Sequence, residues 1–167
     1  MGETAQKIIK VNKTELLKIL NEAYAEEWLA YYQYWLGAKV AAGAMRASIV
    51  KEFEEHSKEE HEHATMIANR IIELGGTPLL SPSDWEKKAH CKYDAPKDEC
   101  SIHLVKDNLK SERCAIQRYQ NLADMCFGKD HKTYSIAVHI LKEEIEHEQE
   151  MEDFLTDLDM MKNKCMK

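Results

Sequence analysis

Residues that break helices are few in this chain and gather at a few places, which leaves four long uninterrupted segments. The breaks are marked by Gly43, by Gly75-Gly76-Thr77-Pro78, by the stretch between Pro82 and Pro96, and by Phe127-Gly128-Lys129-Asp130. The segments between them show a helical period and predict helices at about 12–42, 45–74, 101–127 and 131–162. Such lengths are typical of an all-α antiparallel bundle, and the few turn residues disfavour an all-β fold, which would need them frequently.

The connections between these segments predict how the bundle is joined. The first and last breaks are short, so each predicted helix pair forms an antiparallel hairpin. Residues 75–100 are too many for a turn and can run the length of the bundle, with a short helix expected around Ser83–Ala89. We therefore expect residues 1–167 to form one domain: a tail at 1–11, then a four-helix bundle of two hairpins joined by one long crossover.

Each predicted helix carries an apolar stripe that is interrupted at its middle by charged or polar residues. The interrupting residues are Glu27 in the first helix, Glu60 and His63 in the second, Glu112 in the third, and Glu144 and His147 in the fourth. Four buried, unpaired carboxylates would carry a heavy desolvation cost. A cation must therefore lie among them.

The spacing of these residues makes the prediction sharper. Glu27 and Glu60 are 33 residues apart and Glu112 and Glu144 are 32 apart, and Glu60 and Glu144 each begin a Glu-x-x-His motif. This internal repeat places all six groups at one level of the bundle. The set matches the ligands of carboxylate-bridged di-iron or di-manganese centres, and four carboxylates balance two divalent cations. Oxygen and imidazole ligands favour iron or manganese over structural zinc. We expect two iron ions per chain, with manganese or zinc as the alternatives.

The charge and the cysteine content exclude several classes of protein. The chain has 23 Lys and Arg against 30 Asp and Glu, a net charge of −7, which disfavours a nucleic-acid-coating protein. A DNA-binding tail stays open as a weaker alternative because of Lys7, Lys10, Lys13 and Lys18. Five irregularly spaced cysteines argue against a disulfide-stapled secreted domain. No stretch approaches about 18 consecutive apolar residues, and the first residues lack an apolar signal core. We expect a cytoplasmic protein without membrane contact.

Several runs of residues resemble known families. The run Glu27-Trp28-Leu29-Ala30-Tyr31-Tyr32-Gln33-Tyr34 resembles the first metal-binding helix of bacterioferritins, and residues 140–148 resemble their last ligand helix. The run Glu112-Arg113-Cys114-Ala115-Ile116, followed by Gly128-Lys129-Asp130 and Thr133-Tyr134, resembles the Dps-like proteins called thioferritins. The resemblance covers most of residues 14–160. It identifies the chain as a member of the ferritin-like superfamily.

The resemblance implies an iron-storage cage that oxidises Fe(II) with hydrogen peroxide or O₂, stores Fe(III) and protects against oxidative stress. The six Glu and His residues match the family's ferroxidase ligands, all within one subunit. Tyr34 matches a tyrosine that supplies an electron near that site, with a packed core aromatic as the alternative. No haem is expected, because His61 stands where bacterioferritins have their haem methionine. The short segment after Met160 favours a 12-subunit, Dps-like shell.

Cys91 and Cys114 match the thioferritin cysteine pair, which implies a redox pair; the alternative is two unrelated thiols. Cys100, Cys126 and Cys165 match no motif. His56 shares the stripe of the second-helix ligands, so it is expected either beside the metal ligands or as a core histidine.

Two other functions remain open from the sequence. One is a dedicated di-iron or di-manganese enzyme of the peroxidase or catalase type, without mineral storage. The other is a DNA-compacting Dps shell, which the net charge of −7 disfavours.

Overall fold

The computed structural model describes residues 2, 4 and 7–165, and side chains as far as residue 163. Residues 1, 3, 5 and 6 of the predicted tail lie outside the described residues. Four long helices make up the bundle: α2 (Lys13–Val40), α3 (Arg46–Glu73), α5 (Ser101–Cys126) and α6 (His131–Met160). The shorter elements are η1 (Pro82–Asp84), α4 (Trp85–Lys88) and a π-helical turn, η2 (Met161–Cys165).

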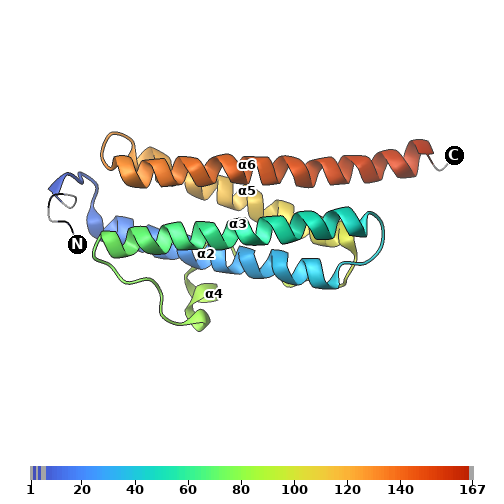
Figure 1. Ribbon diagram of the computed structural model, residues 1–167, viewed down its shortest axis with the longest axis horizontal. Helices are drawn as coiled ribbons and strands as arrows, with labels where there is room; N and C mark the ends of the chain where they lie inside the picture. Colours follow the sequence, from blue (N-terminus) through green and yellow to red (C-terminus); the bar gives the residue numbers. More distant parts are fainter. Residues whose placement is uncertain (1, 3, 5–6, 166–167) are drawn as a thin grey trace.

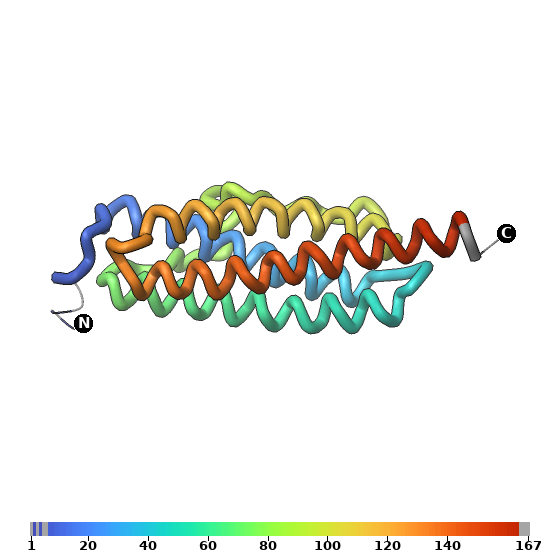
Figure 2. Tube along the Cα trace, turned by 90° about the horizontal axis from the view of Figure 1, so that it is seen from above, coloured from blue at the N-terminus to red at the C-terminus, as the bar shows by residue number. Residues whose placement is uncertain are grey.

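The long helices form two hairpins that lie side by side, α2 with α3 and α5 with α6 (Figures 1 and 2). The crossover leaves the end of α3, passes outside α2 with α4 packed against that helix, and returns to the opposite end of the bundle (Figure 1). The predicted all-α bundle of two hairpins and one long crossover is therefore confirmed. Among the described residues, no helix is long and apolar enough to cross a membrane.

The helix ends follow from local backbone chemistry. Asn12 caps α2, because its side-chain oxygen accepts hydrogen bonds from the Thr14 and Glu15 amides at 3.0 and 3.2 Å. The helix ends at Val40, two residues before its predicted end, since Ala41 turns to an extended ψ of 130°. Gly128, in the α5–α6 turn, has a φ of +68°, which a side chain would disfavour.

The start of α6 is fixed by a buried ion pair. Asp130 caps the helix through the Thr133 amide at 3.1 Å, and Arg70 of α3 donates to both Asp130 oxygens at 2.9 and 2.7 Å. Arg70 and Asp130 are both buried. This contact joins the second hairpin to the first at one end of the bundle.

Two apolar clusters fill the bundle core. The first contains Leu16, Leu20, Ile67, Ile71, Leu122 and Ile140, and the second contains Tyr34, Ile49, Phe53, Val105 and Met151. On all four helices, the residues between these two clusters include the polar residues that interrupt the apolar stripes. The fold therefore encloses a polar centre between two apolar ends.

Candidate metal centre

The structure brings the six predicted ligand residues together, and each is at most 3 % exposed. Their ligand atoms fall into two groups in which all atoms lie within 4.8 Å of one another. One group is Glu27, Glu60, His63 and Glu144, and the other is Glu60, Glu112, Glu144 and His147. Glu60 and Glu144 belong to both groups. The arrangement therefore offers two adjacent cation positions with two shared, bridging carboxylates.

Several oxygen and nitrogen atoms in this centre lack a hydrogen-bond partner despite being buried. They are Glu27 Oε2, Glu60 Oε1, both carboxylate oxygens of Glu144, and His147 Nδ1. A buried polar atom without a partner costs about 1–3 kcal/mol. Five such atoms from the predicted ligands indicate that the donor set fits divalent metal ions.

The charges in the centre are mutually unfavourable without a cation. Burial, and then repulsion from Glu144, raises the pKa of Glu112 to about 7, and the same two causes raise the pKa of Glu60 well above its ordinary range. Burial alone would lower the pKa of His63, but the nearby carboxylates of Glu144 and Glu27 raise it strongly. The metal-free centre therefore holds extra protons, which divalent cations would displace.

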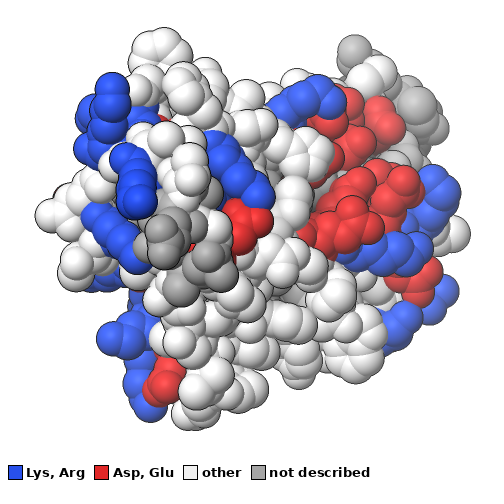
Figure 3. Space-filling model, turned by 60° about the vertical axis from the view of Figure 1, so that its left-hand side comes forward, with Lys and Arg blue, Asp and Glu red and all other residues white. Residues whose placement is uncertain are grey.

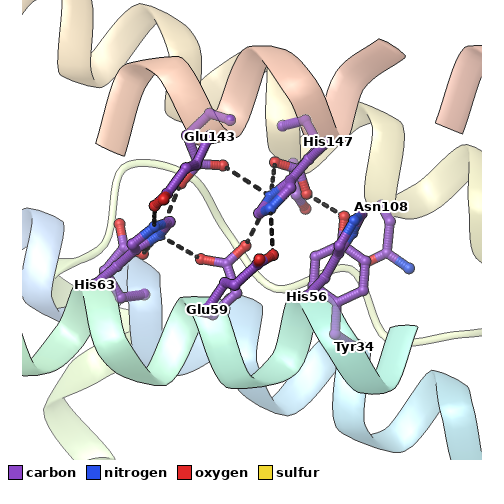
Figure 4. A network of polar contacts seen from close by, with 12 residues as sticks. Tyr34, His56, Glu59, His63, Asn108, Glu143 and His147 are labelled. Atoms are coloured by element: carbon purple, nitrogen blue, oxygen red, sulfur yellow. Dashed lines mark hydrogen bonds and ion pairs between the residues drawn. The ribbon is translucent and has the colours of Figure 1, made fainter. Parts of the chain in front are cut away.

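His63 and His147 each turn one ring nitrogen toward the four carboxylates of the centre and the other away from them (Figure 4). His63 Nδ1 lies 3.2 Å from Glu144, while its Nε2 lies 2.7 Å from Glu143. His147 Nδ1 lies 3.7 Å from Glu60, Glu112 and Glu144, while its Nε2 lies 2.9 Å from Glu59. A carboxylate on the outer nitrogen of a metal-ligating histidine fixes the ring orientation and the tautomer. Nδ1 is therefore the ring nitrogen that could bind a metal on both rings.

Hydrogen bonds around the centre run from one helix hairpin to the other. The Tyr34 hydroxyl on α2 donates a hydrogen bond to Glu112 on α5, and the Tyr119 hydroxyl on α5 donates one to Glu27 on α2. Each tyrosine stands seven residues after the glutamate of its own helix. The outer histidine nitrogens also contact the other hairpin. His63 on α3 contacts Glu143 on α6, and His147 on α6 contacts Glu59 on α3.

Sequence reasoning missed Tyr119, Glu59 and Glu143. Tyr119 fits an apolar stripe, and the two glutamates fit a solvated helix face. The signal that could have found them is the full repeat, in which both halves read Glu-x₆-Tyr and then Glu-Glu-x-x-His.

His56 lies against the centre and not in it. Its ring stacks on His147 at a centroid distance of 3.9 Å, and its Nε2 lies 2.8 Å from Glu150. Burial, and then the neighbouring His147, lowers the pKa of His56 to about 4. An acidic pocket of about 90 Å³ opens beside these two rings and is lined by Glu52, Glu55, Glu59, Glu143, Glu146 and Glu150.

On another side, the crossover covers the centre. The structure joins Cys91 of the crossover to Cys114 of α5 by a disulfide with a Cα–Cα distance of 5.8 Å. Glu26 accepts a hydrogen bond from the Cys91 amide at 3.3 Å, and Arg118 pairs with Glu26 at 2.8 Å. Beneath this segment lies a cavity of about 20 Å³, lined by Cys91 together with ligand carboxylates of the centre. A space of that size holds one water-sized molecule.

A two-hairpin helical bundle with a buried centre of four glutamates and two histidines defines the class of ferritin-like carboxylate proteins. The chain belongs to the ferritin-like domain family, whose family model matches residues 17–161.

Several known proteins are similar to this chain. A solved structure of the bacterioferritin-related protein from Bacteroides fragilis, described as a dodecameric thioferritin, is 52 % identical with a TM-score of 0.97, covering 99 % of this chain and 100 % of that one. The DNA protection during starvation protein of Pyrococcus furiosus is 34 % identical, covering 87 % of this chain and 80 % of that protein. A bacterial non-heme ferritin of Staphylococcus epidermidis is 30 % identical, with 85 % and 83 % covered. The resemblance to thioferritins predicted from the sequence is thereby confirmed.

Proposed function

We propose that this chain assembles into a 12-subunit cage that oxidises Fe(II) at its buried centre and stores Fe(III). The observation that carries the proposal is the pair of shared carboxylates, Glu60 and Glu144, whose unpartnered oxygens lie between two adjacent ligand groups. Two relatives support the assembly and the storage role: one is named as a dodecameric thioferritin and the other as a bacterial ferritin. Iron is the substrate here as well as the stored product.

Two adjacent iron positions suit an oxidant that takes up two electrons. Two Fe(II) ions and one hydrogen peroxide, with two protons, give two Fe(III) ions and two water molecules, so no hydroxyl radical is released. The residues hold the two ions side by side, and Tyr34 and Tyr119 orient the terminal ligands Glu112 and Glu27. We further propose Tyr34 as an electron donor when the centre holds one iron, because its ring lies beside both Glu112 and the His56 ring.

The cysteine pair is proposed to exchange between a dithiol and a disulfide. Peroxide oxidises one thiolate to a sulfenic acid and releases hydroxide, which takes up a proton to give water, and the second thiol then forms the disulfide and releases a second water. The bridge holds the crossover over the small cavity at the centre. Peroxide could therefore both react at the centre and fix the segment that covers it.

The activity is tested by rapid mixing of the protein with Fe(II) and peroxide. Glu144→Ala and His63→Ala should abolish rapid oxidation while the far-ultraviolet circular dichroism stays that of a helical protein. Glu62→Ala is the matched control, since Glu62 is exposed on α3 two residues from Glu60. The parent should consume two Fe(II) per peroxide without signal from a hydroxyl-radical spin trap. Parent rates in the two ligand variants would refute the ferroxidase assignment.

The alternative functions differ in assembly and iron content. A shell of 12 chains that retains many irons per chain indicates storage, whereas a small oligomer with at most two indicates a dedicated di-metal enzyme. A DNA-compacting shell would retard DNA in a gel at physiological salt. The Pyrococcus relative is named for DNA protection during starvation. On the face in Figure 3, Lys and Arg predominate at the left, and acidic side chains gather beside Lys and Arg at the right. The net charge of −7 disfavours a DNA-compacting role.

A further inference from the structure

The start of α5 carries three different metal-binding side chains that the ferroxidase proposal does not use. Asp98, Cys100 and His103 each offer a ligand atom, and these atoms all lie within 4.8 Å of one another. Cys100 is a free thiol and is partly buried, while Asp98 and His103 are exposed. The three atoms are a carboxylate oxygen, a thiol sulfur and an imidazole nitrogen.

The backbone at this turn is held in place by the α2–α3 connection. The Ala42 amide donates to the Glu99 carbonyl at 2.7 Å, the Ser101 amide donates to the Ala42 carbonyl at 2.9 Å, and the Ser101 hydroxyl donates to the Ala44 carbonyl at 2.7 Å. Ser101 is fully buried. The two residues that flank Cys100 are therefore fixed by contacts far away in the sequence.

The side chains are also oriented toward one another. Asp98 Oδ1 accepts a hydrogen bond from the Cys100 amide at 2.9 Å, which turns the carboxylate back over the start of α5. His103 Nδ1, one turn into the helix, lies 2.9 Å from Asp98 Oδ2. The Cys100 amide, then the His103 side chain, lowers the pKa of Asp98, so this carboxylate is charged at neutral pH.

We propose that Asp98, Cys100 and His103 form a second metal site, of the zinc type, at the start of α5. Zn²⁺ accepts thiolate, imidazole and carboxylate ligands together, and sites with three protein ligands keep a fourth position for water. Thiolate and carboxylate neutralise the two charges of the ion. Binding of the ion displaces the proton of the Cys100 thiol.

This site differs from the buried centre in place and in chemistry. Cys100, which directly precedes α5, and Glu112 on that helix are twelve residues apart, about 18 Å along the helix axis. The buried centre has no thiolate ligand, whereas this site has one. A metal here would clip the end of the crossover to α5, as the disulfide clips its middle. The site stands whether or not the ferroxidase proposal holds.

The test is a titration of metal-free, disulfide-bonded protein with Co²⁺ as the probe for Zn²⁺, followed by thiolate-to-cobalt charge-transfer absorption. The band should appear in the parent, disappear on adding Zn²⁺, and be lost in Cys100→Ser and in His103→Ala. It should persist in Glu144→Ala, which disables the buried centre, and in Cys126→Ser, the matched variant at the second free cysteine among the described side chains. Absence of the band in the parent, or its survival in Cys100→Ser, would overturn the proposal.

A second measurement locates the thiol directly. Zn²⁺ should protect Cys100 from alkylation in the parent, as read by peptide mapping, and should give no protection in His103→Ala. Equal alkylation of Cys100 with and without Zn²⁺ in the parent also overturns the site.

Discussion

Glu112→Gln should stabilise the metal-free protein above neutral pH while abolishing the stabilisation that metal binding at the buried centre provides. Burial and the neighbouring Glu144 raise the pKa of Glu112 to about 7, whereas an unfolded glutamate has a pKa of about 4.3. Between these values the folded state binds a proton that the unfolded state has lost, so the stability of the parent falls as pH rises. Glutamine has no such proton to lose. Its amide oxygen can still accept the Tyr34 hydrogen bond.

The size of the effect follows from the two pKa values of Glu112. A separation of about 2.7 pH units, at about 1.4 kcal/mol per unit, gives about 4 kcal/mol above pH 7 and nothing near pH 4. For a chain of this size, 4 kcal/mol corresponds to about 8–16 °C in Tm. The assay is thermal unfolding of chelator-treated protein at fixed concentration from pH 4 to 8.

The control for this prediction is Asp124→Asn, an exposed acid on the same helix, which should follow the parent at every pH. Adding Co²⁺ should reverse the order, because metal bound at the buried centre raises the Tm of the parent and not of the variant, while the proposed site at Cys100 contributes equally to both. If the Tm of the parent and that of Glu112→Gln change with pH in the same way from 5 to 8, then burial does not raise the pKa of Glu112, and the reasoning fails.

Two further predictions concern the buried ion pair at the start of α6 and the disulfide of the crossover. Hydrogen bonds from Thr133 and Arg70 outweigh burial and lower the pKa of Asp130, so its stabilisation is present above about pH 4 and lost as pH falls through the lower folded value. Asp130→Asn should therefore cost about 3–5 kcal/mol near neutral pH, by leaving Arg70 buried without its charge partner, and the gap in Tm from the parent should close in acid. Brief peroxide treatment of reduced protein should give a Cys91–Cys114 crosslink on peptide mapping that a thiol reductant removes. A mixture of other cysteine pairings would contradict the proposed exchange between dithiol and disulfide at this pair.

The fold could be predicted from the sequence because long helices leave a period that few other structures share. That the six Glu and His residues come together could be predicted for a related reason. A carboxylate in the middle of an apolar stripe, such as Glu60, has no stable place unless a cation accompanies it, so pattern and chemistry agree.

The contacts between helices could not be predicted in the same way. Tyr119 is equally suited to an apolar core, and Glu59 to a solvated face, so the role of each depends on which side chain faces it from another helix. Asp98 and His103 lie close to Cys100 because the α2–α3 connection holds the backbone in a turn there. A helical or strand period in the sequence does not predict such a turn.

The central claim is that the buried centre binds two metal ions bridged by Glu60 and Glu144. It is tested most directly by anomalous diffraction at the iron edge from crystals loaded anaerobically with Fe(II). We expect two peaks in each subunit, one among Glu27, Glu60, His63 and Glu144 and one among Glu60, Glu112, Glu144 and His147. Iron found only in the acidic pocket beside His56, or no iron between the two shared carboxylates, would contradict the account.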